Sequence, residues 1–374
     1  MSGAPGFAVY IHWPFCETVC PYCDFNVHAA RDIDQAAWRD GLIADLANYA
    51  TDTPGRTVTS VYFGGGTPSL MPPETAGALI DSVSKLWSLS PDAEITIEAN
   101  PTSAETGRLA AFRRAGINRL SLGIQSFDDG ALSFLGRTHT GAEGFAALSR
   151  AQEVFERVTF DLMYALPGQS LLSWQAQLGE SLKQAAGHLS LYQLTIESGT
   201  PFAKQKVTGV DEDLAADMFD MTNEVLAEAG MPAYEVSNHA RPGEESRHNL
   251  TCWRGGDYIG AGPGAHGRVT IDGQTLGTHQ IHNPVRWLEK IKTEGHGSAK
   301  RRPLSIRDRA REYIMMGLRL SEGIHLDTTL ADVVDAEGLQ QLVDGGLLQR
   351  DGMHIRTTPA GRLTLNAVTA KLLS

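Results

Sequence analysis

The sequence predicts an α/β protein, built as an open partial (β/α)6 barrel with additional strands and followed by a small winged-helix-like domain. Over residues 8–229, short runs rich in β-branched and aromatic residues alternate with amphipathic helical stretches. This alternation is typical of a parallel sheet with crossover helices. From position 301 onward the pattern changes to helical stretches and one hairpin signal. A chain of 374 residues with 42% hydrophobic content can bury a large core and a second, smaller one.

The barrel is predicted from six strand-like runs in chain order. The strands are expected at 8–12, 58–63, 94–99, 119–123, 158–164 and 189–194. The helices are expected at 33–49, 73–89, 104–115, 141–156, 172–186 and 211–229. An added strand is expected at 232–237. We expect a core barrel over 1–237, an extension with its connection over 238–300 and the small domain over 301–374.

The small C-terminal domain is expected to contain three helices and a hairpin. The helices are predicted at 306–320, 329–336 and 339–343, and the hairpin strands at 347–350 and 353–357 around Asp351-Gly352. Modules of this kind often bind DNA. However, ten Lys and Arg against nine Asp and Glu leave the domain with a net charge of +1, which is too small for a basic footprint. The whole chain carries −12, which argues against a nucleic-acid partner.

Composition also suggests the compartment. Residues 1–6 have no basic region typical of a signal peptide, and no apolar run reaches membrane-spanning length. The chain has four cysteines, three of them in one short segment, which fits a reducing compartment better than a disulfide framework. We therefore expect a cytoplasmic protein without a transmembrane segment.

The three clustered cysteines follow the first expected strand directly. Cys16, Cys20 and Cys23 have spacings of four and three, and the only other thiol is the distant Cys252. A zinc site of four cysteines would have to recruit that distant thiol. A [4Fe–4S] cluster can be held by three thiolates, with one iron left for an exchangeable ligand. We expect this cluster, with a zinc knuckle or a free-thiol cluster as the alternative.

Polar or glycine positions lie at the carboxyl ends of four expected strands and on a fifth. They are Tyr10, Gly64–Thr67, Glu98, Gln125 and Asp161. Any one of them alone could be a buried polar group whose hydrogen bonds are made within the core, or part of a turn. Because the carboxyl ends of parallel strands meet at one mouth, together they predict a site. The three glycines would let the backbone approach a ligand closely, with their amide groups donating to it.

The run Tyr10–Phe15 followed by C-x3-C-x2-C resembles the radical S-adenosylmethionine (SAM) superfamily. Specifically, it is similar to the branch that contains the oxygen-independent coproporphyrinogen III dehydrogenases and the HemW haem chaperones. The resemblance implies a radical SAM barrel in which the open iron chelates the amino and carboxylate groups of SAM. In that superfamily an electron from the cluster cleaves SAM to a 5′-deoxyadenosyl radical. If that happens here, a flavodoxin or ferredoxin would be the electron donor.

The resemblance also implies which residues touch the cofactor. Tyr22, inside the cysteine loop, would lie beside the adenine of SAM. Gly65, Gly66 and Thr67 belong to a segment that resembles the GGGTP segment of the family, which binds the methionine part of SAM in relatives.

Five further positions match the family. Glu98 would accept hydrogen bonds from SAM, and Tyr10 and Glu98 are the expected catalytic residues, with Tyr10 also binding the cofactor. Gln125, Arg137 and Asp161 match positions that contact a second SAM in the dehydrogenases. Whether one or two SAM molecules bind stays open.

Residues 248–253 read H-N-L-T-C-W and resemble the HNxxYW segment that is associated with haem binding in HemW chaperones. Cys252 stands where the family has tyrosine. His248, Cys252 and Trp253 are expected to bind haem, with His248 as the iron ligand because a thiol must first lose a proton. Glycines nearby argue against a helix here. The alternative is that these side chains simply wall the mouth of the barrel.

Three functions are consistent with this resemblance. The first is a haem chaperone that binds the cluster, SAM and haem and passes haem to acceptor apo-haemoproteins. The others are a coproporphyrinogen III dehydrogenase in porphyrin biosynthesis and a radical enzyme for an unrelated small molecule. The dehydrogenases carry a fourth cysteine where this chain has Phe25. They also have an amino-terminal extension before the cluster motif, whereas here only fifteen residues precede Cys16. Both differences favour the chaperone.

Overall fold

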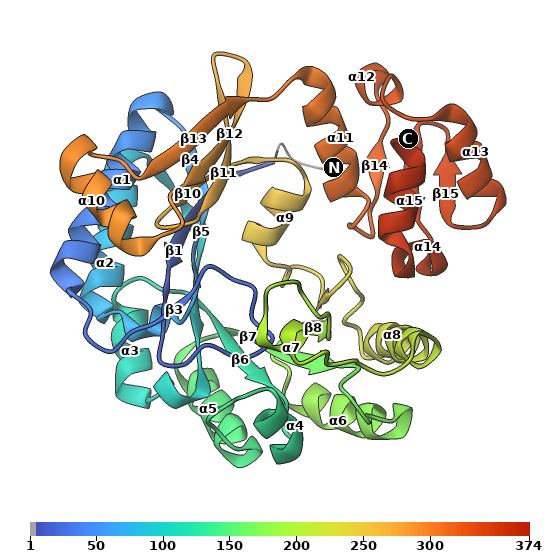
Figure 1. Ribbon diagram of the computed structural model, residues 1–374, viewed down its shortest axis with the longest axis horizontal. Helices are drawn as coiled ribbons and strands as arrows, with labels where there is room; N and C mark the ends of the chain where they lie inside the picture. Colours follow the sequence, from blue (N-terminus) through green and yellow to red (C-terminus); the bar gives the residue numbers. More distant parts are fainter. Residues whose placement is uncertain (1–4) are drawn as a thin grey trace.

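One large mixed sheet dominates the computed structural model, which describes residues 5–374 (Figure 1). Its central strands are adjacent, parallel and in chain order. These strands are β1 (Phe7–Trp13), β4 (Thr57–Gly65), β5 (Ser88–Ala99), β6 (Arg119–Gln125), β7 (Arg157–Tyr164) and β8 (His188–Gln193). The predicted six-stranded partial barrel is therefore confirmed.

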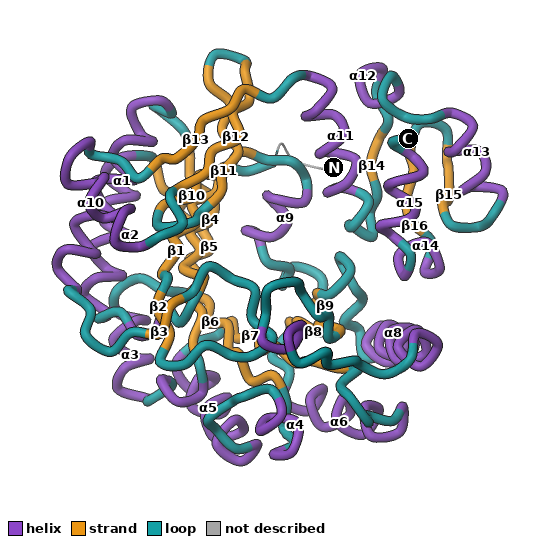
Figure 2. The backbone as a smooth tube through the Cα atoms, viewed as in Figure 1, coloured by secondary structure: helices purple, strands orange, loops and turns teal. Residues whose placement is uncertain are grey.

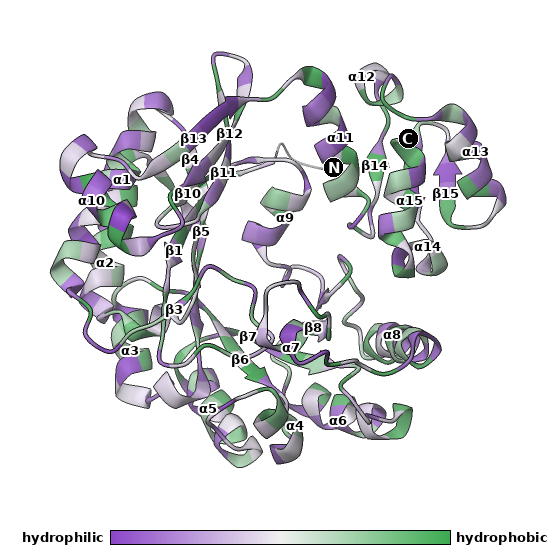
Figure 3. Cartoon of the chain, in the orientation of Figure 1, coloured by the Kyte–Doolittle hydropathy of each residue, from purple (hydrophilic) through white to green (hydrophobic). Residues whose placement is uncertain are grey.

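Helices cover the outer face of this sheet (Figure 2). They are α1 (Gln35–Asp52), α2 (Pro73–Leu86), α3 (Thr106–Arg114), α5 (Gly141–Val154), α6 (Leu171–Gln184) and α8 (Glu212–Glu228). Each turns apolar side chains inward, and the outer helices show both hydrophobic and hydrophilic segments in Figure 3. Alternate residues of the strands, such as Ile95 and Ile97 of β5, pack against these helices in the main core. The other residues of each strand face the barrel interior.

Three details of the barrel differ from the sequence prediction. Helix α2 ends at Leu86, because Trp87 is extended, and β5 already begins at Ser88 rather than at 94. The strand expected at 232–237 is wrong. Tyr234 N donates to Asn238 O across a turn, and the added strand β9 comes later, at Asn238–Ala240, antiparallel to β8. A short helix between β6 and α5, α4 (Asp129–Phe134), was not predicted.

The extension adds four strands beyond β1. Strand β10 (Asp257–Ala261) is parallel to β1, and β11 (His266–Ile271), β12 (Gln274–Gln280) and β13 (Ser298–Pro303) follow antiparallel. Helix α10 (Pro284–Glu294) lies outside, where Trp287 stacks on Trp38 of α1. Residues 247–253 form a helix, α9 (Arg247–Trp253), so the expectation of a non-helical segment is wrong.

Several short elements complete the barrel. The cysteine loop carries the two-residue strands β2 (Phe15–Cys16) and β3 (His28–Ala29), which pair with each other. Helix α7 (Pro201–Lys204) follows β8. Two short 3-10 helices, η1 (Pro68–Leu70) and η2 (Pro101–Ser103), follow β4 and β5.

The C-terminal domain has its own apolar core and a three-stranded sheet. Its helices are α11 (Ile306–Gly317), α12 (Thr328–Ala331), α13 (Ala336–Asp344), α14 (Pro359–Leu363) and α15 (Leu365–Leu372). Its strands are β14 (Ile324–His325), β15 (Leu348–Asp351) and β16 (His354–Thr357). The three predicted helices and the hairpin are present, and β14, α14 and α15 add to them. Between residues 5 and 374 no helix is long and apolar enough to cross a membrane.

Candidate functional site

A cavity of about 360 Å³ opens among the carboxyl ends of the parallel strands. Most of the residues predicted from strand ends and from the cysteine loop line it together. They are Cys16, Cys20, Tyr22, Cys23, Gly65, Gly66, Thr67, Glu98, Gln125, Arg137 and Asp161. Four other predicted residues, Tyr10, His248, Cys252 and Trp253, are not part of this lining. One residue of α9, Asn249, does line the cavity, so the helix with the predicted haem residues adjoins the predicted SAM site, although those haem residues lie outside the lining.

The three clustered thiols form one wall of the cavity. Burial raises the pKa of Cys16 to about 11, and it also raises the pKa of Cys23. A bound cation reverses such shifts, because a coordinating thiol is deprotonated outright. Within residues 5–374, no three His, Cys, Asp or Glu side chains are close enough to share a single metal ion. In a [4Fe–4S] cluster each thiolate binds a different iron, so the three cysteines fit a cluster better than a zinc ion.

The glycine segment packs directly against the cysteine loop. A Cβ on Gly66 would lie 2.5 Å from the carbonyl oxygen of Phe15 and 2.9 Å from Cys16 Sγ. The amides of Gly66 and Thr67 donate to the carbonyls of Trp13 and Phe15 at 2.7 and 2.8 Å. Both amides are therefore already used, and the expectation that the glycine amides donate to a ligand is wrong for Gly66. What the segment offers is a surface without side chains beside the cluster loop.

Two half-buried carboxyl groups, on β5 and β7, face the cavity from either side of β6. Glu98 accepts hydrogen bonds from the Tyr62 hydroxyl at 2.8 Å and from the Gly65 amide at 3.2 Å. Burial, aided by the nearby charge of Asp161, raises the pKa of Glu98 to about 7. Burial likewise raises the pKa of Asp161 to about 7. Both carboxyls can therefore change protonation state near neutral pH, which is typical of functional sites.

Arg137 joins the cysteine loop to the strand ends. Its guanidinium donates to Cys20 Sγ at 3.5 Å, to Asn100 Oδ1 at 2.8 Å and to the Gly123 carbonyl at 2.8 Å. Its buried Nε has no partner within residues 5–374. Gln125, which ends β6, has a left-handed backbone with φ 70°. Backbone strain of this kind in a non-glycine residue often marks a ligand site.

Helix α9 lies inside the barrel, behind an aromatic layer. His248 stacks on Tyr62 with ring centroids 4.8 Å apart, and it also lies beside Tyr10. Burial lowers the pKa of His248 to about 4 and raises the pKa of Cys252 to about 12, so both groups are neutral at pH 7. Cys252 Sγ lies 4.0 Å from His248 Nε2, one helical turn away. Trp253 lies on the other side, under the guanidinium of Arg319.

Comparison with known proteins identifies the family. The Radical SAM superfamily model matches residues 10–175, and the HemN C-terminal domain model matches residues 304–364. The heme chaperone HemW of Escherichia coli is 36% identical, with all of this chain and all of that protein covered. The chain belongs to the HemW family of radical SAM proteins.

Other relatives and a solved structure agree with this membership. The HemW-family chain is 42% identical to the mitochondrial radical S-adenosyl methionine domain-containing protein 1 of Bos taurus, over 100% of this chain and 89% of that protein. Coproporphyrinogen III oxidase (HemN) of E. coli matches in structure with a TM-score of 0.82, covering 99% of this chain and 90% of that one. Its sequence identity is 23%, so this match concerns the fold.

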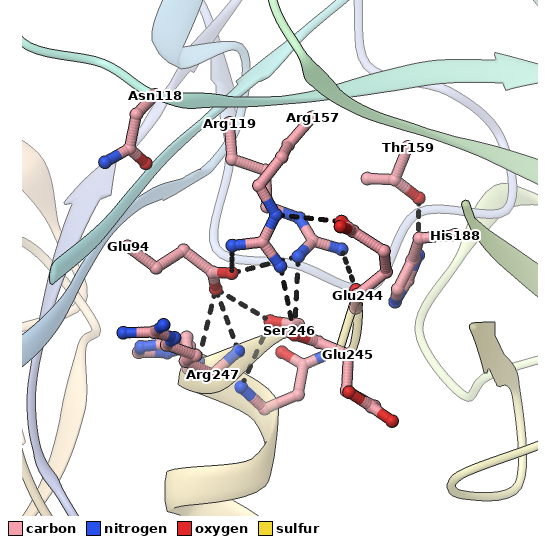
Figure 4. A network of polar contacts seen from close by, with 12 residues as sticks. Glu94, Asn118, Arg119, Arg157, Thr159, His188, Glu244, Glu245, Ser246 and Arg247 are labelled. Atoms are coloured by element: carbon pink, nitrogen blue, oxygen red, sulfur yellow. Dashed lines mark hydrogen bonds and ion pairs between the residues drawn. The ribbon is translucent and has the colours of Figure 1, made fainter. Parts of the chain in front are cut away.

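A buried network holds the N-terminus of α9 against the barrel of the HemW-family chain (Figure 4). Glu94 of β5 pairs with Arg119 at 2.9 Å and with Arg157 at 3.0 Å. The same carboxylate accepts the Arg247 amide at 2.9 Å, and Arg157 also pairs with Glu244. A negative charge at the first turn of a helix is favourable, because free amides point toward it. Sequence reasoning missed this network, since its members have no local pattern.

The C-terminal domain holds the other end of α9. The Arg254 guanidinium binds both carboxylate oxygens of Glu322, at 2.7 and 2.8 Å. Arg309 of α11 donates to the carbonyl of Gly255, and Arg319 lies 4.4 Å from the centroid of the Trp253 ring. Helix α9, which carries the segment that resembles a haem-binding motif, is thus fixed between the barrel and the C-terminal domain.

Two further residues of the site were not assigned a role from the sequence. Asn100 donates to Thr67 Oγ1 at 2.9 Å and accepts from Arg137. Tyr62 connects His248 to Glu98. The period of two along β4 could have indicated Tyr62, because it lies two positions before Gly64 and so on the same face of the strand.

Proposed function

We propose that this protein is a haem chaperone that binds a [4Fe–4S] cluster, SAM and haem and transfers haem to acceptor apo-haemoproteins. The observation that carries the proposal is the similarity to the heme chaperone HemW of E. coli over the full length of both chains. Phe25 adds support, because it stands where the dehydrogenases of the branch have a fourth cysteine. The proposed compartment is the cytoplasm, and the proposed domain limits are 1–237, 238–300 and 301–374.

The cavity offers a place for both small cofactors. Cys16, Cys20 and Cys23 would hold the cluster, which supplies an open iron for the amino and carboxylate groups of SAM and an electron for its cleavage. Glu98, already fixed by Tyr62 and Gly65, would accept from the cofactor. If SAM is cleaved, a flavodoxin or ferredoxin would bring the electron.

The other predicted cofactor contacts surround this position. Tyr10, Tyr22, Gly65, Gly66 and Thr67 would line the SAM site from the side of the cysteine loop. Gln125, Arg137 and Asp161 would line it from the strands across the cavity, where all three face the same space.

Haem is proposed to involve α9 and its residues His248, Cys252 and Trp253. The first two lie on one face of the helix, and the ring of His248 is buried against Tyr10 and Tyr62. Iron ligation by His248 would therefore require α9 to move away from this layer. Because the C-terminal domain holds the C-terminal end of α9, this domain would control such a movement.

The test is anaerobic reconstitution of the cluster followed by two parallel assays. Hemin titration monitored at the Soret band should show binding, and the loaded protein should pass haem to an apo-haemoprotein such as apomyoglobin. Coproporphyrinogen III, incubated with SAM and a reductant and analysed by chromatography, should stay unchanged. Turnover of coproporphyrinogen without haem binding would instead establish the dehydrogenase.

A further inference from the structure

Three histidines of the extension gather at the carboxyl edge of the large sheet, outside the cavity. His266 and His279 are cross-strand partners in β11 and β12, and their rings stack with centroids 4.1 Å apart. The ring of His282 meets His279 edge-on at 4.6 Å. His266 and His282 are exposed. We call these three residues the histidine patch.

The patch adjoins the loop that follows the cluster cysteines. Asn26 donates through its side-chain amide to the carbonyls of Pro263 and His282, both at 2.9 Å. Next to it, the Phe25 side chain is 64% exposed and lies at the mouth of the cavity. An exposed aromatic residue beside several imidazoles is an unusual surface, since large apolar side chains are mostly covered.

A cation completes the surface. Lys300 of β13 is the register partner of His279, so their side chains share a face of the sheet. Lys300 is exposed and forms no ion pair within residues 5–374. The patch therefore offers imidazoles and a positive charge on the same face of the sheet, and the loop held against it by Asn26 carries an exposed apolar ring.

This combination fits an iron porphyrin better than a free metal ion. A free ion needs three or four protein ligands that converge, and no three such side chains converge within the part of the chain that the structure describes. The iron of haem already has four porphyrin nitrogens and needs only one or two axial ligands. Its two propionates would be attracted to a lysine, and its flat apolar face to an aromatic ring.

We propose that the histidine patch is a haem site separate from α9, at which an exposed imidazole of His266 or His282 binds the iron. This inference rests on the proposed haem function, and it names a place where haem can bind while His248 stays buried. Because the patch lies at the edge that also carries the cluster loop, haem could be received there before α9 moves.

The test is hemin titration of the full-length, cluster-reconstituted protein. In the patch variant His266→Ala/His279→Ala/His282→Ala, we expect hemin affinity to fall about tenfold or more and the low-spin imidazole signal in the electron paramagnetic resonance spectrum to be lost. His282→Ala alone should show part of this loss. His325→Ala removes an exposed histidine of the C-terminal domain and is the matched control, which should bind like the parent.

Two comparisons make the outcome decisive. Metal-free protoporphyrin IX should bind the parent and the patch variant alike, because without iron the imidazoles have nothing to ligate. If the patch variant lost affinity for protoporphyrin IX as well as for hemin, axial ligation by the patch would be contradicted. A patch variant with the affinity and spectrum of the parent would overturn the inference while the chaperone function stands. A parent that binds no hemin would overturn the proposed function itself.

Discussion

The imidazole of His248 stacks on the ring of Tyr62, and the hydroxyl of the same tyrosine donates to Glu98 at 2.8 Å. One side chain thus contacts both the predicted haem segment and the predicted SAM site. If α9 moved away, one face of the Tyr62 ring would lose its contact with His248, and the environment of the Glu98 carboxyl would change. This contact is a physical route by which haem and SAM binding can influence each other.

The first prediction tests that route. His248→Ala should weaken SAM binding by about two- to tenfold, because an aromatic pair contributes about 0.5–1.5 kcal/mol beyond its buried area. His248→Phe keeps a ring against Tyr62 and should bind SAM like the parent. Isothermal titration of the reconstituted protein measures both, and equal affinities in the two variants would contradict the coupling.

A second prediction concerns the cluster. Cys16→Ser, Cys20→Ser or Cys23→Ser should each lose iron and the visible charge-transfer absorption after anaerobic reconstitution, because thiolates are the ligands. Circular dichroism should show that the fold survives. Cys252→Ser is the matched control, since this thiol lies beside His248 on α9 and is not part of the cavity lining. Loss of the cluster in the control would show that the three-cysteine assignment is wrong.

The buried ion pairs of Glu94 yield a third prediction. Glu94→Gln should lower the free energy of unfolding by about 3–5 kcal/mol, because Arg119 would remain buried without its counter-charge. Asp92→Asn removes an exposed partner of Arg247 on the same strand and should lower the free energy of unfolding far less, because solvent screens this pair. Urea titration followed by circular dichroism compares the two. If both variants lost a similar free energy of unfolding, the buried network would stabilise the fold no more than an exposed ion pair does.

A fourth prediction uses the raised pKa of Asp161, about 7 in the folded protein. An unfolded Asp ionises near pH 3.9, so between these values only the folded chain keeps the proton, and stability falls as pH rises. Asp161→Asn stays neutral throughout. It should therefore raise the thermal midpoint of the cofactor-free protein at pH 8 and raise it less at pH 5, where only part of this stability has been lost.

The control for this fourth experiment is Asp332→Asn, at an exposed position of the C-terminal domain. This substitution removes a carboxyl that is exposed in the folded protein. Differential scanning fluorimetry should therefore find no pH-dependent gain in the thermal midpoint. If Asp161→Asn shifts the thermal midpoint equally at both pH values, burial of the charge is not what destabilises the site.

The cavity was predictable where local patterns and strand order act together. The cysteine spacing and the period of two along the strands brought Cys16, Glu98 and Asp161 to one mouth. The α9 helix was not predictable in this way. Its first amides are held by Glu94, which lies over 150 positions earlier in the chain, so a tertiary contact overrides the glycines that follow it.

The glycine segment shows a second limit of sequence reasoning. A run of glycines indicates close approach, but it does not say to what. In the structure the approaching groups are Phe15 O and Cys16 Sγ, within the chain itself. A side chain at Gly66 would therefore strain the cluster loop as well as the SAM surface, and Glu98→Gln is the cleaner probe of SAM binding alone.

Strand β5 carries Glu94, Thr96 and Glu98 on alternate positions, and all three face the interior while Ile95 and Ile97 face the helices. Pairing shifted by one residue would point both glutamates and the threonine into the apolar layer and both isoleucines into the polar cavity. The anchor of α9 and the acid at the cavity mouth would be lost together. A chain with β5 misaligned by one residue would thus lack both of these regions at once.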